Sequence, residues 1–298
     1  MKKIPVILDT DIGEDIDDLW ALCYLLKCPE LDLKMVLTDL EDTVYRAKVT
    51  CKFLEVAGRT DVPVGIGIRQ PCDPITKTHA AWIEDYELNK YKGNIRRDGV
   101  DAMIEIIRAS ATPITIICIC PMPNIKAALE KAPDIAPKCR FVGMMGSIKK
   151  RHSGADGAIA ENNIVRDLAA SKALFSAKWL SFAITPLDSC GNLRLQGEKY
   201  QEVKNCKNPA TAALIENYRL WSRVGDRFSS CSSILYDTVA FYMAFSTEYL
   251  KLEKMRLVVD DKGYTRESAD GITADVAMDW KDLGAFEDHL VKRLTEGV

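Results

Sequence analysis

The fold of this chain is decided by residues 4–27, which read IPVILDTDIGEDIDDLWALCYLLK. The short apolar run at residues 4–8 is typical of a buried strand. An acidic loop follows it, and apolar residues then recur at helical spacing over residues 17–27, until Pro29 ends the pattern. A strand that is followed directly by a helix predicts the start of a β-α-β unit.

The same alternation continues along most of the chain. We expect further strands at residues 31–40, 62–68, 114–120, 140–146 and 181–187, and further helices at 44–56, 99–109, 124–131 and 167–177. Short apolar strands that alternate with helices predict an α/β fold, with a mainly parallel, mixed sheet flanked by helices. Beyond residue 196 we expect helices at 209–223, 232–245 and 283–294 and strands at 255–260 and 272–280. The chain is predicted to form one domain over residues 1–298, with a late helical insertion at 196–246 over the site.

Composition restricts the class of protein and its partners. The chain has 298 residues, with 40 Lys and Arg against 43 Asp and Glu, and a formal net charge of −3. This balance gives no electrostatic reason to expect nucleic acid or an anionic membrane as a partner. The most apolar run, 114–120, is far shorter than the roughly 18 residues of a membrane-spanning helix. The ten cysteines include no C-x-x-C pair, and Asp9 follows the first residues too soon for a signal peptide. We therefore expect no secretory signal, reduced thiols, no zinc and a cytoplasmic location.

The acidic loop after the first strand predicts a metal site. Residues 9–18 read DTDIGEDIDD and contain six acids in ten positions. Carboxylates at that density repel one another unless a cation lies among them, and an oxygen-rich, flexible set suits Ca²⁺ better than Mg²⁺. Complementing the dipole of the following helix accounts for Asp17 and Asp18 but not for all six acids. Because ligands of open parallel sheets bind beyond the carboxyl ends of strands, this loop is the first candidate site.

The same loop resembles the N-terminal signature of the inosine–uridine-preferring nucleoside hydrolase family, D-x-D-P-G-x-D-D-x-x-A. The chain fits it when two residues are inserted after Gly13, which keeps Ala21 in step. Segments in the family's order and approximate spacing include 47–50, 62–64, 123–125, 144–146, 160–163, 187–188 and 236–237. The resemblance implies the family's fold and Ca²⁺-dependent hydrolysis of the N-glycosidic bond of a ribonucleoside to ribose and free base.

The resemblance also implies a set of metal ligands. Asp11, Asp18 and Asp237 would hold Ca²⁺ through their carboxylates, and Ile119 through its backbone carbonyl. Asp11 would in addition act as the general base that takes a proton from the metal-bound water. The reaction would pass through an oxocarbenium-like transition state, which an electron-rich site under the sugar favours.

Other residues match the family's contacts to the ribose. Asp17 would bind a ribose hydroxyl, although Asp15 lies in the presumed insertion and is an alternative. Glu161 and Asn163 match the pair that grips the sugar and orients its C1′ atom. A polar turn before a helix is the ordinary explanation for such a pair, so their role depends on the resemblance.

The residues that would serve the leaving base are less regular. Some family members protonate the base with a histidine just before the last ligand, and this chain has Tyr236 there. A phenol is a weaker acid at pH 7 than an imidazolium. His79, in the long loop at 69–97, is a second candidate for this contact. Trp221, on the helix expected at 209–223, is a candidate to stack on a nucleobase, although a Trp at helical spacing is more often a core residue.

Other functions stay open at this point. The chain could be a divergent N-glycosyl hydrolase with a non-standard leaving group, or a non-catalytic relative that binds nucleoside or ribose. A phosphatase of the haloacid dehalogenase type is a further alternative, because residues 9–11 after an apolar strand imitate its D-x-D nucleophile loop. The family resemblance implies a small-molecule nucleoside substrate, a role in purine or pyrimidine salvage, and a homodimer or homotetramer.

Overall fold

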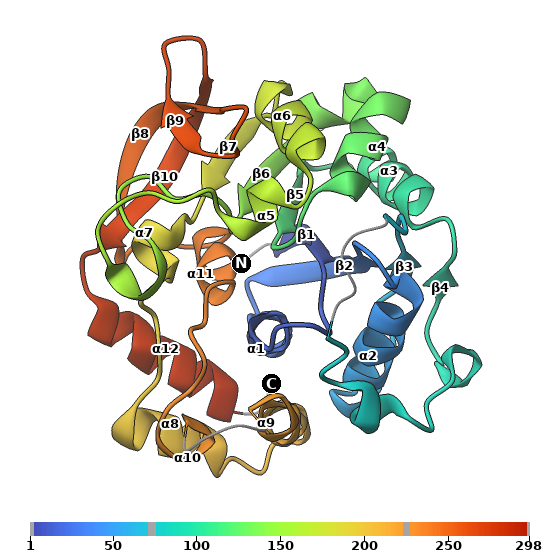
Figure 1. The fold of residues 1–298 in the computed structure, drawn as a ribbon. Coiled ribbons are helices and arrows are strands. Elements are labelled where there is room, and N and C mark those ends of the chain that lie inside the picture. The colour runs from blue at the N-terminus through green and yellow to red at the C-terminus, as the bar shows by residue number, and fades with distance from the viewer. Residues whose placement is uncertain (1–2, 71–75, 223–226, 297–298) are drawn as a thin grey trace.

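The structure is a computed structural model that describes residues 3–70, 76–222 and 227–296 (Figure 1). Within these ranges a ten-stranded sheet has the spatial order β4-β3-β2-β1-β5-β6-β7-β10-β8-β9. Its strands are β1 Ile4–Thr10, β2 Leu31–Thr38, β3 Val64–Ile66, β4 Ile95–Arg96, β5 Ile114–Cys118, β6 Cys139–Gly143, β7 Ser181–Ile184, β8 Leu250–Val259, β9 Thr265–Glu267 and β10 Ile272–Trp280. The strands from β4 across to β10 pair in parallel, whereas β8 and β9 pair antiparallel. The predicted α/β fold with a mainly parallel, mixed sheet is confirmed.

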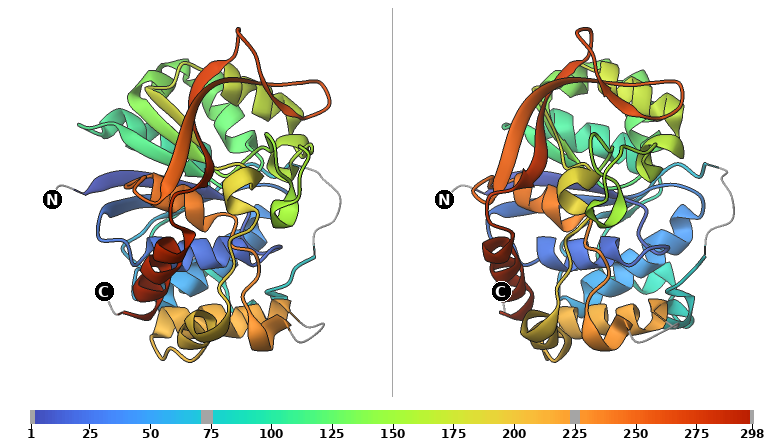
Figure 2. Two further views of the ribbon diagram at one scale, coloured as in Figure 1. Left: turned by 90° about the vertical axis from the view of Figure 1, so that its left-hand side faces the viewer. Right: turned by 60° about the vertical axis from the view of Figure 1, so that its left-hand side comes forward.

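Helices cover both faces of this sheet (Figure 1). The α-helices are α1 Asp17–Leu25, α2 Thr43–Val56, α3 Gly99–Ala109, α4 Pro123–Lys131, α5 Asn162–Val165, α6 Leu168–Ser176, α7 Leu187–Cys190, α8 Gly197–Lys204, α9 Pro209–Trp221, α10 Arg227–Ser230, α11 Thr238–Met243 and α12 Leu283–Thr295. Short 3₁₀ turns are η1 Ala80–Ile83, η2 Leu88–Lys90, η3 Pro133–Lys138 and η4 His152–Gly154. Helices α3, α4 and α6 lie on one face, and α1, α2 and α11 on the other. Figure 2 shows α8, α9 and α10 farther from the sheet, beneath α1 and α2. None of the described helices is both long and apolar enough to cross a membrane.

Side chains along the central strands point alternately to the two faces of the sheet, and a hydrophobic core lies on each face. Val6 and Leu8 of β1 point into the core that contains Trp20 of α1, whereas Ile7 between them points into the core that contains Met103 of α3. All five side chains are fully buried. Because successive side chains of a strand face opposite sides, a strand covered on both faces is apolar throughout. Full burial of each such side chain contributes roughly 1.5–3 kcal/mol.

The strand order places a crevice at β1. The chain runs from β1 outward through β2, β3 and β4, and it then returns to β5 on the other side of β1. The loops after β1 and β5 therefore diverge at the carboxyl edge of the sheet. In open α/β sheets this reversal of direction is where ligands bind.

Several predicted elements have other bounds in the structure; the strand expected at 255–260, for example, already begins at Leu250. Two further differences lie close to the carboxyl edge of the sheet. The expected helix at 232–245 begins only at Thr238, because the amides of Ser232 and Leu235 donate to the carbonyls of Leu195 and Leu193 and keep that stretch out of the helix. The strand expected at 181–187 ends at Ile184, and Leu187 already begins α7. The described part of the predicted insertion at 196–246 carries α8, α9, α10 and α11.

Candidate functional site

A cavity of about 530 Å³ opens at the carboxyl edge of the sheet. Its walls come from the acidic loop after β1, the segments that follow β5 and β6, the start of α5, the end of α9 and the turn before α11. Seven carboxylates line it: Asp11, Glu14, Asp15, Asp17, Asp18, Glu161 and Asp237. Among the described lining residues these acids are accompanied by one guanidinium, Arg166, and one imidazole, His152. The cavity lining therefore contains far more acidic than basic side chains.

Three of these carboxylates form a tight group. Asp17 and Asp18 begin α1, Asp237 precedes α11, and one oxygen of each lies within 4.8 Å of the others. They are only 6%, 4% and 3% exposed. Burial and mutual repulsion raise the pKa of all three carboxyl groups well above the ordinary value. Carboxylates buried this close together stay ionised only with a cation among them, and oxygen donors of this kind fit a hard divalent metal ion.

The predicted ligands Asp11 and Ile119 line the same cavity but lie outside that tight group. The Asp11 carboxylate is 8% exposed, and its Oδ2 lies 3.6 Å from Nη1 of Arg166. Burial raises the pKa of Asp11, while the guanidinium groups of Arg46 and Arg166 oppose that shift. The carbonyl of Ile119 takes no hydrogen bond within the described residues, whereas the Cys118 carbonyl beside it accepts from an amide. An unpaired carbonyl at this edge is suited to bind a cation.

Helix α2 holds the acidic loop in place. Gly13 has φ +118°, and a Cβ there would lie 2.7 Å from Cε1 of Tyr45, so only glycine fits. The Tyr45 hydroxyl donates to the Gly13 carbonyl at 2.9 Å. Fully buried Arg46 donates through Nη1 to the Ile12 carbonyl (3.1 Å) and through Nε to the Leu40 carbonyl (2.9 Å). The sequence gives no signal for Arg46, because its partners lie on other loops.

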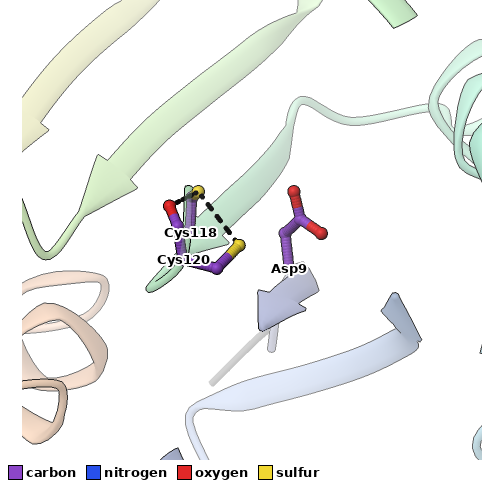
Figure 3. Close-up of side chains that lie close together, drawn as sticks. All are labelled: Asp9, Cys118 and Cys120. Carbon is purple, nitrogen blue, oxygen red and sulfur yellow. Dashed lines mark hydrogen bonds between the residues drawn. The ribbon is translucent and has the colours of Figure 1, made fainter. Parts of the chain in front are cut away.

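A second buried group lies beneath the loop and outside the cavity lining. Figure 3 shows Asp9, at the end of β1, facing Cys118 and Cys120. The thiols lie 3.8 Å apart; Cys118 donates to the Cys120 carbonyl and Cys120 to Oδ2 of Asp39. Oδ1 of Asp9 accepts from Nδ2 of Asn124 at 2.9 Å, and burial raises the pKa of Asp9 to about 7. Because each thiol already donates to an oxygen, we interpret this group as a support for the strand ends.

Two of the predicted ribose contacts, Glu161 and Asn163, lie together at the start of α5 and line the cavity. Glu161 caps α5 and accepts from the amides of Asn163 (3.0 Å), Gly146 (3.1 Å) and Ile164 (3.4 Å). Burial raises the pKa of Glu161 to about 7, although these amides favour the ionised form. Nδ2 of Asn163 donates to the Met144 carbonyl at 3.1 Å, which fixes the amide beside the cavity. Both side chains can accept or donate hydrogen bonds to sugar hydroxyls.

Asp15, the alternative to Asp17, and Trp221, the candidate for stacking on a base, both line the cavity. Asp15 is exposed at the cavity wall, whereas Asp17 is buried in the carboxylate group. Trp221 lines the cavity at the end of α9 and stacks on Tyr218, with ring centroids 5.8 Å apart and planes at 27°. The indole therefore offers an aromatic face that the core does not fully cover.

The two predicted leaving-group residues are in different surroundings. Tyr236 lines the cavity, and its hydroxyl lies 2.9 Å from Nδ1 of His152. His79 is fully buried outside the cavity lining, with its Nδ1 2.8 Å from Oδ1 of Asn217. Burial lowers the pKa of His79 to about 4, so this imidazole is neutral near pH 7. No motif in the sequence marks His152, and its position in the loop after β6, at the carboxyl edge of the sheet, is the one signal that could have found it.

Comparison with known proteins gives a consistent result. The family model described as inosine-uridine preferring nucleoside hydrolase matches residues 6–287. The uncharacterized protein C1683.06c of Schizosaccharomyces pombe is 30% identical over 221 residues, which cover 70% of each chain. The pyrimidine-specific ribonucleoside hydrolase RihA of Photobacterium profundum is 25% identical over 242 residues, 74% of this chain and 73% of its own. The solved structure of a plant nucleoside hydrolase, PpNRh1, has the same fold, with a TM-score of 0.85 at 20% identity over 99% of this chain and 100% of its own.

Proposed function

The chain belongs to the inosine-uridine preferring nucleoside hydrolase family, and from that membership we propose that its cavity hydrolyses a ribonucleoside to ribose and a free base with the help of Ca²⁺. By family the chain is an N-glycosyl hydrolase. The observation that carries the proposal is that the three buried carboxylates and the hydrogen-bonded side chains of Glu161 and Asn163 share one cavity of about 530 Å³. That volume suits a small ligand.

The metal part of the proposal uses the anionic side of the cavity. Asp11, Asp18 and Asp237 would hold Ca²⁺ through carboxylates and Ile119 through its carbonyl. Asp17 is close enough to Asp18 and Asp237 to bind either the ion or a ribose hydroxyl. When bound, Ca²⁺ would offset the buried negative charge and make a coordinated water more acidic.

The chain's own residues would carry out the rest of the reaction. Asp11 would accept the proton of the attacking water as its oxygen bonds to C1′. Glu161 and Asn163 would hold ribose hydroxyls, and the surrounding carboxylates would stabilise positive charge on the oxocarbenium-like transition state.

At the other end of the substrate, the base would stack on Trp221 and leave toward Tyr236. Tyr236 is favoured over His79 as the contact to the leaving base, because His79 is neutral and lies outside the cavity lining.

A second candidate function is a divergent relative that releases a non-standard leaving group or only binds nucleosides. It is favoured by one observation, the tyrosine at the position where some family members have a histidine. Family membership argues against the alternative of a phosphatase of the haloacid dehalogenase type.

The test is a reducing-sugar assay on purified protein with a panel of purine and pyrimidine ribonucleosides. We expect ribose release that a Ca²⁺ chelator abolishes, that added Ca²⁺ restores, and that is absent in Asp11→Asn. Tight Ca²⁺ binding without release from any nucleoside would favour the second candidate. Release of phosphate from phosphate esters would overturn both.

We also propose a homodimer or homotetramer, a place in nucleoside salvage and a reducing, cytoplasmic compartment. The subunit number rests on the family resemblance and would be measured by light scattering during size-exclusion chromatography. The compartment is supported by nine described cysteines that are all free, seven of them buried.

A further inference from the structure

Beside Asp237, the cavity is lined by a hydrogen-bonded pair of side chains, His152 and Tyr236. Nδ1 of His152 lies 2.9 Å from the Tyr236 hydroxyl, and the two rings meet edge to face with centroids 5.6 Å apart and planes at 83°. Both residues line the cavity. Tyr236 directly precedes Asp237, so the two side chains extend from the same turn before α11.

Among the described residues, His152 is the histidine that lines this cavity. The sequence contains three. His79 is buried against Asn217, and His289 on α12 forms a hydrogen bond with Tyr24 at 2.9 Å, away from the cavity lining. His152 is exposed at the cavity wall. It can therefore exchange protons with solvent between turnovers.

The loop that carries His152 is held firmly from below. The carboxylate of Asp188, on α7, accepts the backbone amides of Ile148 (2.8 Å), Lys149 (2.7 Å) and Lys150 (3.1 Å). Farther along, the Gly157 amide donates to the Lys149 carbonyl at 2.8 Å and closes the base of the loop.

The tip of the loop is closed in the same way. The Arg151 amide donates to the Ala155 carbonyl, and the Ser153 amide donates to the Gly191 carbonyl, both at 2.8 Å. Ser153 adopts a left-handed φ of +61°, which a serine rarely takes in a relaxed loop. These constraints fix the turn on which His152 faces Tyr236.

We propose that His152 supplies the proton that the departing base takes, and that Tyr236 relays it. This deepens the proposed function and depends on it. An imidazolium is a far stronger acid than a phenol near neutral pH, so the pair is a better proton source than Tyr236 alone.

Each proton that the relay gives up is replaced. With Nδ1–H of His152 donating to the Tyr236 oxygen, the Tyr236 hydrogen is free to point at the base. As the bond between C1′ and the base nitrogen breaks, its electron pair stays on the base and takes the Tyr236 proton. The proton of His152 passes to the Tyr236 oxygen, which leaves a neutral imidazole that solvent reprotonates.

The test compares two leaving groups in His152→Ala. The base of a nucleoside needs a proton in order to leave. The leaving group of p-nitrophenyl β-ribofuranoside is p-nitrophenolate, a stable anion that needs none. We expect kcat for nucleosides to fall about 100-fold or more, the range of general acid catalysis. Hydrolysis of the nitrophenyl riboside should stay within about threefold of the wild type. Tyr236→Phe should show the same split, and free imidazole should restore part of the nucleoside activity of His152→Ala, because the site is open to solvent.

A matched control is Arg151→Ala, which changes the exposed neighbour on the same turn and should alter neither substrate. Equal losses on both substrates in His152→Ala would indicate a structural role and overturn the relay. Unchanged nucleoside activity would overturn it as well. If the wild type cleaves neither substrate, the proposed function itself fails and the relay fails with it, an outcome distinct from either result on the variant.

Discussion

Three buried carboxylates lie close together in the cavity, those of Asp17, Asp18 and Asp237. Without a cation among them their negative charges repel one another, and this repulsion destabilises the ion-free protein. Removing one charge should therefore have opposite effects with and without Ca²⁺. Asp237→Asn should raise the free energy of unfolding of the Ca²⁺-free protein by roughly 1 kcal/mol, which is the range gained when an unfavourable charge is removed. It should also remove most of the stabilisation that Ca²⁺ gives the wild type, which is about 2.7 kcal/mol at a hundredfold excess over the dissociation constant.

Urea unfolding with chelator and with Ca²⁺ measures both effects. The exposed Asp85→Asn is the control for a lost surface charge and should change neither value. A variant that is destabilised by the same amount in both conditions would contradict a cation site in this group, because the carboxylate would then have a purely structural role.

Glu161 gives a pH dependence with a definite sign. Burial raises its pKa in the folded protein from 4.5 to about 7. Between these values the folded state holds a proton that the unfolded state has lost, so the free energy of unfolding should fall as pH rises from about 4.5 to 7. The slope from this one group is at most about 1.4 kcal/mol per pH unit. Glu161→Gln cannot titrate, and the difference between the variant and the wild type in Ca²⁺-free buffer should follow this slope. A difference that stays constant over this window would contradict it.

For single residues, the sequence predicts a role where that role depends on a local pattern. It does not predict a role that depends on a contact with a residue far away in the chain. The density of acids at 9–18 is enough to predict a cation site from the sequence alone. The pairing of His152 with Tyr236 spans 84 positions, and that of Arg46 with Ile12 spans 34. No local periodicity encodes such contacts, since they exist only after the loops have assembled.

Helix α2 acts as a clamp on two loops at the carboxyl edge of the sheet. Its fully buried Arg46 satisfies the carbonyls of Ile12 and Leu40, and Leu40 and Glu41 both adopt positive φ, at +62° and +52°. Arg46→Ala would leave two buried carbonyls unpaired, each costing about 1–3 kcal/mol. We expect a loss of about 3 kcal/mol or more in the free energy of unfolding, measured by urea denaturation.

The same helix supplies the control for this clamp. Lys48, two residues on, forms an exposed pair with Glu87, and its partner carboxylate is 61% exposed. Surface pairs contribute about 0–1 kcal/mol, so Lys48→Ala should change stability little. If the two variants were equally mild, Arg46 would have no special role in holding the acidic loop.

Elements of strong periodicity were predictable, and those fixed by tertiary contacts were not. The helix at residues 99–109 has the predicted bounds, because its apolar face is regular and Ala109 is followed by a turn. The stretch at 232–235 belongs to the helix expected at 232–245, yet hydrogen bonds to residues 193 and 195 keep it out of the helix. This departure places Tyr236 and Asp237 on a turn rather than within a helix, and both side chains line the cavity.

For the molecule as a whole, the cavity is far more anionic than the chain. The formal net charge of the chain is −3, whereas the cavity gathers seven carboxylates and one guanidinium. A single divalent cation offsets only part of that excess. Like charges in a cleft with low-dielectric walls repel more strongly than on an open surface, so an anionic substrate should be excluded.

This electrostatic imbalance predicts discrimination between a nucleoside and its 5′-monophosphate. We expect kcat/KM for the monophosphate to be lower by about 100-fold or more, which corresponds to about 2.7 kcal/mol. The 5′-O-methyl nucleoside is the control, because it adds bulk at the same position without charge and should lose much less. The penalty on the monophosphate should also shrink as ionic strength rises, since salt screens the cavity field. Equal losses for the methyl ether and the phosphate, unaffected by salt, would show that size rather than charge sets the preference. The excess of carboxylates would then serve the metal ion alone.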